Sequence, residues 1–174
     1  MIKLLKLNNK NVSKNYLKWL KDYQVIRYTQ QKFTKPDYKK LMSFLQKKKE
    51  KKNELFLGIF FNQEHIGNVR LGPIDKNHNT AYIGYMLGER KYWGKGIATK
   101  VVNMICEIGF QKYKLKKINA ACMSLNKASK KILLNNNFQV EGSFKSQHAY
   151  KKKRYTEYYF GLLCKNFIKL HIND

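Results

Sequence analysis

The fold of this chain is decided by residues 92–99, which read Tyr92-Trp93-Gly94-Lys95-Gly96-Ile97-Ala98-Thr99. Residues 80–87 before them are β-branched and aromatic, which predicts a strand. Residues 97–112 after them carry apolar side chains near a 3.6-residue period, which predicts an amphipathic helix. A Gly-x-Gly loop therefore joins a strand to a helix N-terminus. Glycines let the backbone approach an anion, and the free N–H groups of the first helical turn attract negative charge, so the loop predicts a phosphate or pyrophosphate site.

The spacing of this loop separates it from two better-known phosphate loops. It is not a P-loop, because no Gly-Lys-Ser/Thr follows at the required distance, and a dinucleotide fingerprint would need a third glycine where Thr99 stands. Residues 93–98 instead resemble the Q/R-x-x-G-x-G/A pyrophosphate loop of the GNAT acyltransferases, and Tyr-Trp-Gly-Lys-Gly-x-Ala-Thr is similar to their RimJ/RimL branch. Trp93 stands where many members carry Gln or Arg, but the family binds pyrophosphate here mainly through the backbone.

Length and composition predict one globular domain that covers residues 1–174. The chain is 43% apolar and 14% aromatic, with two prolines and no Gly/Ser-rich linker. No apolar run approaches the roughly 20 residues that span a bilayer, and residues 1–7 lack a signal-peptide core and predict a first strand. The three cysteines are widely spaced in apolar stretches, so we expect buried free thiols in a reducing cytoplasm rather than disulfides or a metal site.

The formal net charge of +25 comes almost entirely from lysine, with only four arginines. Proteins that read nucleic acid sequences rely on arginine for bidentate contacts, and these lysines are spread along the chain together with many asparagines, as in proteins of AT-rich genomes. A nucleic-acid-binding module stays open as the non-enzymatic alternative. We interpret the lysine run at residues 47–52 as a solvated helix end. The charge favours a negatively charged substrate over a cationic one.

The remaining patterns predict the element order β-α-α-β-β-β-α-β-α-β-β, which is that of the GNAT fold. The expected class is α/β (α+β), a mixed sheet of about seven strands with about four helices, splayed between the fourth and fifth strands. Residues 23–33 look aromatic and irregular, and are expected to line a pocket. The predicted strands are residues 1–7, 55–61, 65–71, 80–87, 117–123, 138–144 and 155–163. The predicted helices are residues 12–22, a second helix that starts at residue 36 and fades into residues 47–52, and residues 97–112 and 126–136.

A second motif supports the same resemblance. Asn126 and Ser129, followed by Phe138, Glu141 and Gly142, resemble the N-x-x-S…G-F-x-x-E-G signature of the RimJ/RimL branch. Asn137 takes the place of the glycine before the phenylalanine. Asparagine is the next-best residue for a left-handed helix exit, so this departure keeps the expected geometry.

The resemblance implies that acetyl-CoA, as co-substrate and without a metal, binds in the gap between the fourth and fifth strands. The two residues that end the fourth strand would face the pantetheine, the loop amides would hold the pyrophosphate with a lysine adding charge, and the second motif would lie near the thioester. The cofactor-binding residues implied in this way are Met86, Leu87, Gly94, Lys95, Gly96, Ile97, Ala98, Thr99, Asn126 and Ser129.

The implied reaction is direct transfer of acetyl to a primary amine, which needs a base for the amine, a donor for the oxyanion and a proton for the thiolate. A backbone N–H at the end of the fourth strand is the expected oxyanion donor. Many family members protonate the thiolate with a tyrosine seven residues after the asparagine, where this chain has Leu133; we expect Ser129 to replace it. Glu89 is our catalytic candidate for the base, and the spacing leaves other groups open: Asp75, His78, Glu141, His148 and Glu157. A water chain and a chain that binds CoA without catalysis stay open too.

The acceptor amine is expected to be a nucleotide-linked amino sugar of surface-glycan biosynthesis. Residues 65–75 look similar to an I-G-N-x-x-L-G-x-I stretch of sugar-modifying members, and phosphates would suit the basic residues of this chain. The alternatives are a protein N-terminus, as for RimJ/RimL relatives, and other small amines. The candidate substrate-binding residues are Tyr28, Phe33, Arg70 and His148. A homodimer through edge strands near the C-terminus is also expected, whereas nucleic acid is not an expected partner.

Overall fold

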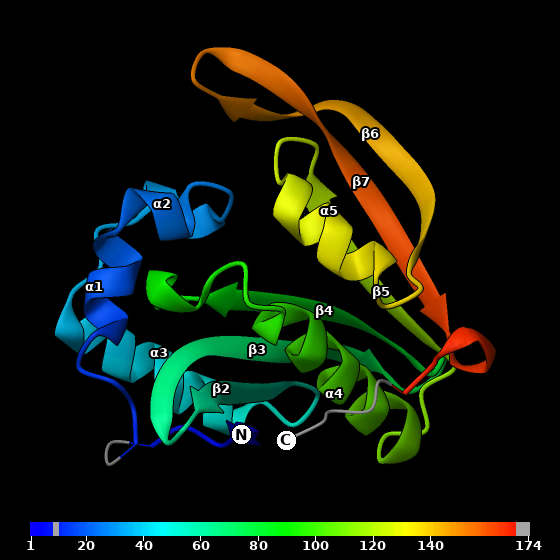
Figure 1. Cartoon of the computed structure of the whole chain (residues 1–174), viewed down its shortest axis with the longest axis horizontal. Helices are drawn as coiled ribbons and strands as arrows, with labels where there is room; N and C mark the ends of the chain where they lie inside the picture. Colours follow the sequence, from blue (N-terminus) through cyan, green and yellow to red (C-terminus); the bar gives the residue numbers. More distant parts are fainter. Residues whose placement is uncertain (9–10, 170–174) are drawn as a thin grey trace.

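The computed structural model describes residues 1–8 and 11–169. Within them, seven strands form one sheet in the order β1-β2-β3-β4-β5-β7-β6 (Figure 1). Neighbouring strands are antiparallel except β4 and β5, which run parallel. This confirms the predicted mixed sheet. The strands are β1 (Ile2–Leu5), β2 (Leu55–Phe61), β3 (Glu64–Asp75), β4 (Thr80–Leu87), β5 (Lys117–Met123), β6 (Gln139–Tyr150) and β7 (Lys153–Leu163).

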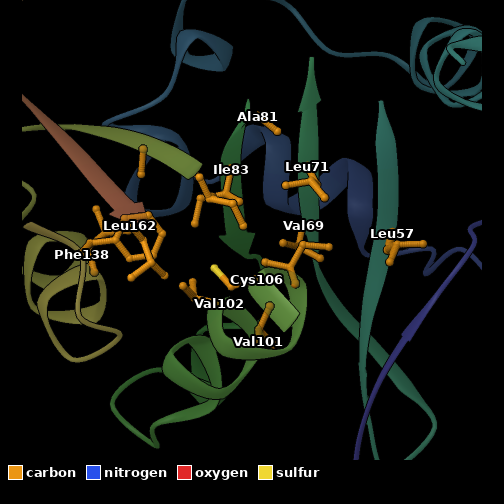
Figure 2. Close-up of a cluster of buried hydrophobic side chains, with 14 of the residues drawn as sticks. Leu57, Val69, Leu71, Ala81, Ile83, Val101, Val102, Cys106, Phe138 and Leu162 are labelled. Atoms are coloured by element: carbon orange, nitrogen blue, oxygen red, sulfur yellow. The ribbon is translucent and has the colours of Figure 1, made fainter. Parts of the chain in front are cut away.

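Helices cover both faces of the sheet and create two separate apolar clusters. In β2, Leu57 and Ile59 belong to the cluster beneath α4, drawn in Figure 2, whereas Phe60 belongs to the cluster beneath α1 and α3. The alternation follows from the two-residue period of a strand. None of the described helices combines the length and apolar character needed to cross a membrane. The helices are α1 (Tyr16–Lys21), α2 (Tyr23–Ile26), α3 (Tyr38–Glu50), α4 (Ile97–Gln111) and α5 (Lys127–Leu134), with 3-10 turns η1 (Gln30–Phe33), η2 (Arg90–Tyr92) and η3 (Cys164–Asn166).

The parallel strands β4 and β5 separate soon after they begin. Their pairing joins Thr80–Tyr82 to Lys117–Asn119 and then stops, while β4 continues to Leu87 along β3 and β5 continues to Met123 along β7. The last residues of β4 therefore keep one hydrogen-bonding edge free of β5. The predicted splay is confirmed, and Figure 1 shows the two strands diverging.

The structure corrects three predicted boundaries. The first helix begins at Tyr16 rather than at residue 12, and residues 23–33 contain α2 and η1 instead of irregular chain, so the segment before β2 has one helix more than expected. β3 runs through Gly72-Pro73 to Asp75, because a register shift between Leu71 and Ile74 absorbs the interruption.

A fourth correction concerns the last hairpin, which is longer than predicted. The predicted strands leave residues 145–154 between them, but only Lys151 and Lys152 form the turn. Their φ angles of 47° and 61° are those of a two-residue hairpin turn whose twist matches the flanking strands. The hairpin of β6 and β7 thus projects towards α2 (Figure 1).

Candidate active site

The glycine loop is open and left-handed at both glycines. Gly94 and Gly96 have φ angles of 74° and 73°, a region that residues with a Cβ adopt only with strain. A Cβ built on either glycine would meet no atom within 4 Å, so backbone conformation requires these glycines and the space above them is open. Gly96 precedes α4 without a side-chain cap. The first N–H groups of α4 are therefore available to an anion.

The indole of Trp93 fastens this loop to the end of β4. Its Nε1–H donates a hydrogen bond of 3.0 Å to the carbonyl oxygen of Leu87. The ammonium of Lys95 lies 5.7 Å from the ring centre of Tyr92, at the same turn. This bond joins the glycine loop to Leu87, at the end of β4 that does not pair with β5.

On the other side of the gap, Ser129 of α5 contacts Tyr85 of β4. The two hydroxyl oxygens are 2.8 Å apart. Asn126 caps α5, because its Oδ1 accepts a 3.2 Å bond from the Ser129 N–H. Burial raises the pKa of Tyr85, and the bond to Ser129 opposes this only in part, so the phenol keeps its proton at neutral pH. The pair is a protonated donor at the point where the two strands separate.

Tyr85 is the residue that sequence reasoning missed. The family spacing directs attention to position 133, where Leu133 is 1% exposed in the core. The tyrosine that reaches the serine comes instead from β4, 44 positions before Ser129. The available signal was the alternation of β4, which places Tyr85 on the same face as Ile83 and therefore towards α4.

The strand register sorts the candidate bases. Asp75 pairs with Thr80 at the beginning of β4, and it caps the turn that contains His78. Glu141 forms a 2.6 Å ion pair with Lys117 at the beginning of β5. These three groups lie at the end of the sheet remote from Leu87.

Glu89 lies just after the end of β4, but its carboxylate is hydrogen-bonded to α1 and to the residue that precedes α1. Its Oε1 accepts bonds of 2.8 Å from Trp19 Nε1 and of 3.1 Å from Asn15 Nδ2. This carboxylate fastens α1 to the end of β4, and it has no lysine partner among the described ion pairs.

Glu157 and His148 form a second polar pair near the gap. Glu157 lies opposite Met123, the last residue of β5, and its Oε1 is 3.0 Å from His148 Nε2. Its Oε2 accepts a 3.0 Å bond from the hydroxyl of Tyr159. Burial raises the pKa of Cys122 to about 11; the charge of Glu157 adds to this rise, and a bond to Ser129 opposes it. Glu157, Cys122 and Ser129 therefore share one neighbourhood.

A cavity of about 500 Å³ lies between the sheet and the helices of its opposite face. Arg70 of β3, one of the candidate substrate-binding residues, lines this cavity. The cationic lining residues outnumber the acidic one, Asp37. The charged and polar residues that line it are Tyr16, Thr29, Gln31, Thr34, Lys35, Asp37, Lys40, Lys48, Asn68, Arg70 and Tyr85.

The other three predicted substrate-binding residues do not line this cavity. The ring of Tyr28 lies 6.0 Å from that of Tyr150 at the tip of the hairpin. Phe33 is 71% exposed, with Lys32 beside its ring. His148 faces Glu157. Among the described residues, no group of three or more His, Cys, Asp or Glu side chains is placed to hold a metal ion.

Comparison with known proteins agrees with this geometry. A family model described as "Acetyltransferase (GNAT) domain" matches residues 4–139. The chain is similar to "Uncharacterized N-acetyltransferase p20" of Bacillus licheniformis, with 35% identity over 60% of this chain and 58% of that protein. The chain therefore matches somewhat more than half the length of this curated relative.

Solved structures share the arrangement over nearly the whole chain. Microcin C7 self immunity acetyltransferase MccE in complex with acetyl-CoA and AMP has 25% identity and a TM-score of 0.78, covering 93% of this chain and 92% of its own. RimL, the ribosomal L7/L12 α-N-protein acetyltransferase, in complex with coenzyme A, has 15% identity and a TM-score of 0.82, with 93% of each chain covered. Spermidine N-acetyltransferase from Vibrio cholerae, in complex with CoA and spermine, has 17% identity and a TM-score of 0.83, with 95% of this chain and 96% of that chain covered. The last two likenesses concern the fold alone.

Proposed function

This chain belongs to the acetyltransferase (GNAT) family, and we propose that it transfers an acetyl group from acetyl-CoA to a primary amine on an anionic small molecule. The observation that carries the proposal is the left-handed, sterically open loop at Gly94 and Gly96, beside the free edge of β4. Backbone donors in this arrangement fit a pyrophosphate followed by an extended amide-bearing arm.

In this proposal, the amides of residues 94–99 hold the pyrophosphate, and Lys95 adds positive charge. The free edge of β4 at Met86 and Leu87 pairs with the pantetheine amides, and one of its N–H groups receives the charge that develops on the acetyl oxygen. Acetyl-CoA supplies an activated acyl group and a thiolate leaving group. Asn126 keeps its Nδ2 available, because Oδ1 is used in capping α5.

Ser129 and Tyr85 supply the proton for the departing sulfur. Ser129 donates its hydroxyl proton to the sulfur, and Tyr85, 2.8 Å away, passes its phenol proton to Ser129 and regains one from solvent as CoA leaves. A general acid of this kind contributes about 10²–10⁴-fold to a rate. The tyrosine that the family motif expects after Asn126 is thus replaced by one from β4.

We assign the base to Glu157, assisted by His148, rather than to Glu89. Oε1 of Glu89 is already occupied by two N–H donors, which hold the side chain against α1 rather than towards an acceptor. Glu157 lies opposite the last residue of β5, beside Cys122 and Ser129, and its histidine partner can pass a proton towards solvent.

We take the cavity lined by Arg70 as the site of the acceptor amine and call it the acceptor cavity. Its charge favours a nucleotide-linked amine. Lys35, Lys40, Lys48 and Arg70 line it, and the one acidic lining residue, Asp37, already accepts a bond from the Lys40 N–H. A relative of similar structure, MccE, was solved with AMP beside acetyl-CoA. We therefore keep a nucleotide-linked amino sugar as the first acceptor and a protein N-terminus as the second. A polyamine is disfavoured by the charge.

A dimer is proposed through the outer edge of β6. This strand has no neighbour on its outer side within the described sheet, and Val140 and Phe144 are 47% and 56% exposed along it. An exposed edge with apolar side chains favours pairing with another chain. We further propose a cytoplasmic location, which suits the free cysteines.

The proposed function is tested by thiol release from acetyl-CoA with three acceptors: a UDP- or dTDP-linked amino sugar, an N-terminal peptide and spermidine. We expect turnover with the nucleotide sugar, loss of that turnover in Gly96→Trp, and little with spermidine. Turnover with the peptide alone would transfer the proposal to a protein N-terminus. Equal turnover with spermidine would contradict the proposal of an anionic acceptor. Absence of acetyl-CoA binding would contradict the proposal that the chain is an acetyltransferase.

A further inference from the structure

A second cavity of about 500 Å³ lies at the edge of the sheet, away from the glycine loop. It exists because β1 pairs only with Gly58–Phe61, so the beginning of β2 is left without a strand beside it. The chain leaving β1 and the ends of α3 and α4 enclose the space. Its floor is apolar and includes Leu45, Leu55 and Tyr113. Six lysines line it: Lys6, Lys48, Lys49, Lys51, Lys52 and Lys112.

The charge in this second cavity is unbalanced. Its one acidic lining residue, Glu54, has a side chain only 3% exposed, and it is paired with Lys48 and, at 3.8 Å, with Arg70. The other five lysines have no ion pair with a carboxylate anywhere in the described residues. Cations gathered against a wall of low dielectric raise the local potential to several kT and concentrate anions.

We propose that this second cavity binds a small anion that carries several phosphate groups. Ammonium groups bind phosphate as point charges that need no fixed geometry, so a cluster of mobile lysines suits a chain of phosphates better than a single carboxylate. A volume of about 500 Å³ is in the usual range of small-ligand sites. Five of these six lysines are exposed, and they differ from the other surface lysines in that they line one cavity together.

Lys48 connects the second cavity with the acceptor cavity. Lys48 lines both cavities. The carboxylate of Glu54 forms ion pairs with Lys48 and with Arg70, which lines the acceptor cavity. A phosphate that draws the Lys48 ammonium towards itself leaves Arg70 as the remaining ion-pair partner of Glu54. The closer pairing with Glu54 then turns the Arg70 guanidinium away from the acceptor. Occupancy of the second cavity therefore weakens acceptor binding, and by linkage the acceptor weakens phosphate binding. This coupling rests on the proposed function, whereas the binding itself does not.

The binding is tested by isothermal titration of tripolyphosphate into the whole chain at about 150 mM salt, with excess CoA present so that the glycine loop does not take up the probe. We expect the triple variant Lys49→Gln, Lys51→Gln, Lys52→Gln to bind about tenfold more weakly or worse, because three of the charges that concentrate the anion are removed.

The matched control, Lys18→Gln, Lys76→Gln, Lys145→Gln, removes the same charge from exposed positions outside both cavities and should bind within about twofold of the unchanged chain. Equal weakening in the two triple variants would overturn the site, because net charge alone would then explain it. A single-stranded RNA that displaces tripolyphosphate stoichiometrically and binds more tightly would assign the lysines to nucleic acid instead.

The coupling is tested with Glu54→Gln. In the unchanged chain, tripolyphosphate should raise the KM for the acceptor severalfold and leave kcat unaltered. In Glu54→Gln, tripolyphosphate should still bind but no longer change KM. A KM shift that persists in this variant would overturn the Glu54 connection. If no acceptor is acetylated at all, the proposed function fails, while the titrations above still decide the binding site.

Discussion

The two halves of the candidate active site are built on different principles. The cofactor half, formed by β4, the glycine loop, α4, β5 and α5, offers mainly backbone groups whose positions follow from φ angles, helix termini and an unpaired strand edge. The acceptor half, formed by α1–α3 with β2 and β3, offers side chains that come from distant parts of the chain. Cofactor binding should therefore tolerate changes of side-chain charge that alter the choice of acceptor. It should be lost when the geometry of the glycine loop changes.

The largest effect is expected for Gly96→Trp. A bulky residue at a φ of 73° is strained and fills the space that the loop keeps open. We expect kcat/KM for acetyl-CoA to fall by about 100-fold or more, as for other losses of preorganised backbone donors. Steady-state kinetics measures the fall, and circular dichroism should be unaltered. An unchanged kcat/KM for acetyl-CoA in Gly96→Trp would show that the loop does not bind the cofactor.

Glu157→Gln should come next, because the amide cannot accept the amine proton. We expect kcat to fall by about 100-fold, partly recovered at high pH where the amine is already deprotonated. Glu89→Gln is the matched control: it should lower the melting temperature, through its bonds to Trp19 and Asn15, more than it lowers kcat at saturation. The reverse pattern would restore Glu89 as the base.

Tyr85→Phe removes one hydroxyl from the proposed acid pair. We expect kcat to fall by about 10- to 100-fold with little change in KM for acetyl-CoA. Because the two hydroxyls act as one unit, Tyr85→Phe combined with Ser129→Ala should be little worse than either change alone. Multiplicative losses in the double variant would show that the two hydroxyls work separately.

Arg70→Gln distinguishes the two halves most cleanly. We expect KM for an anionic acceptor to rise by about tenfold, the effect of one lost charged contact, while KM for acetyl-CoA stays the same. Lys18→Gln, an exposed change on α1, should alter neither value. If both KM values rise together in Arg70→Gln, the halves are not independent.

The smallest effect is expected from pH, through His65. This side chain is 4% exposed; its Nδ1 accepts from the Ser13 N–H, and its Nε2 donates to the Gly67 carbonyl. Burial lowers its pKa below the usual 6.5, and the hydrogen bonds to Asn68 and Gly67 oppose this only in part.

The unfolded chain therefore binds an extra proton at pH values just below 6.5, which the folded chain does not. The free energy of unfolding is at its full value above this pH and falls by at most about 1.4 kcal/mol per pH unit below it, until the folded pKa is reached. Hydrogen exchange at pH 7.5 and 5.5 should show α1 loosening before α4. In His65→Gln this pH dependence should be flatter; an unchanged slope would assign it to other groups.

The sequence predicted the cofactor half well because local patterns determine it. The bounds of β4 and β5 match, and α4 begins at Ile97 as expected. Asn137 has the predicted left-handed conformation, with a φ of 62°. Such features depend on a few consecutive residues, whose propensities are read directly from the chain.

The acceptor half was harder to predict because tertiary contacts create it. The short helices within residues 23–33 are held by capping bonds of Asp22 and Thr29, and they lack the apolar period that identifies a longer helix. The approach of Tyr85 to Ser129, the bonds of Glu89 to α1 and the ion pairs of Glu54 each join residues remote in sequence. Tyr28, Phe33 and His148 remain predictions as substrate-binding residues.

The central claim is tested most directly by following backbone amide resonances while acetyl-CoA is added to the whole chain. The account predicts saturable shifts at Gly94–Thr99 and at Met86 and Leu87, all absent in Gly96→Trp. Saturable binding with shifts confined to the lysine-lined second cavity, or binding that survives in Gly96→Trp, would contradict it.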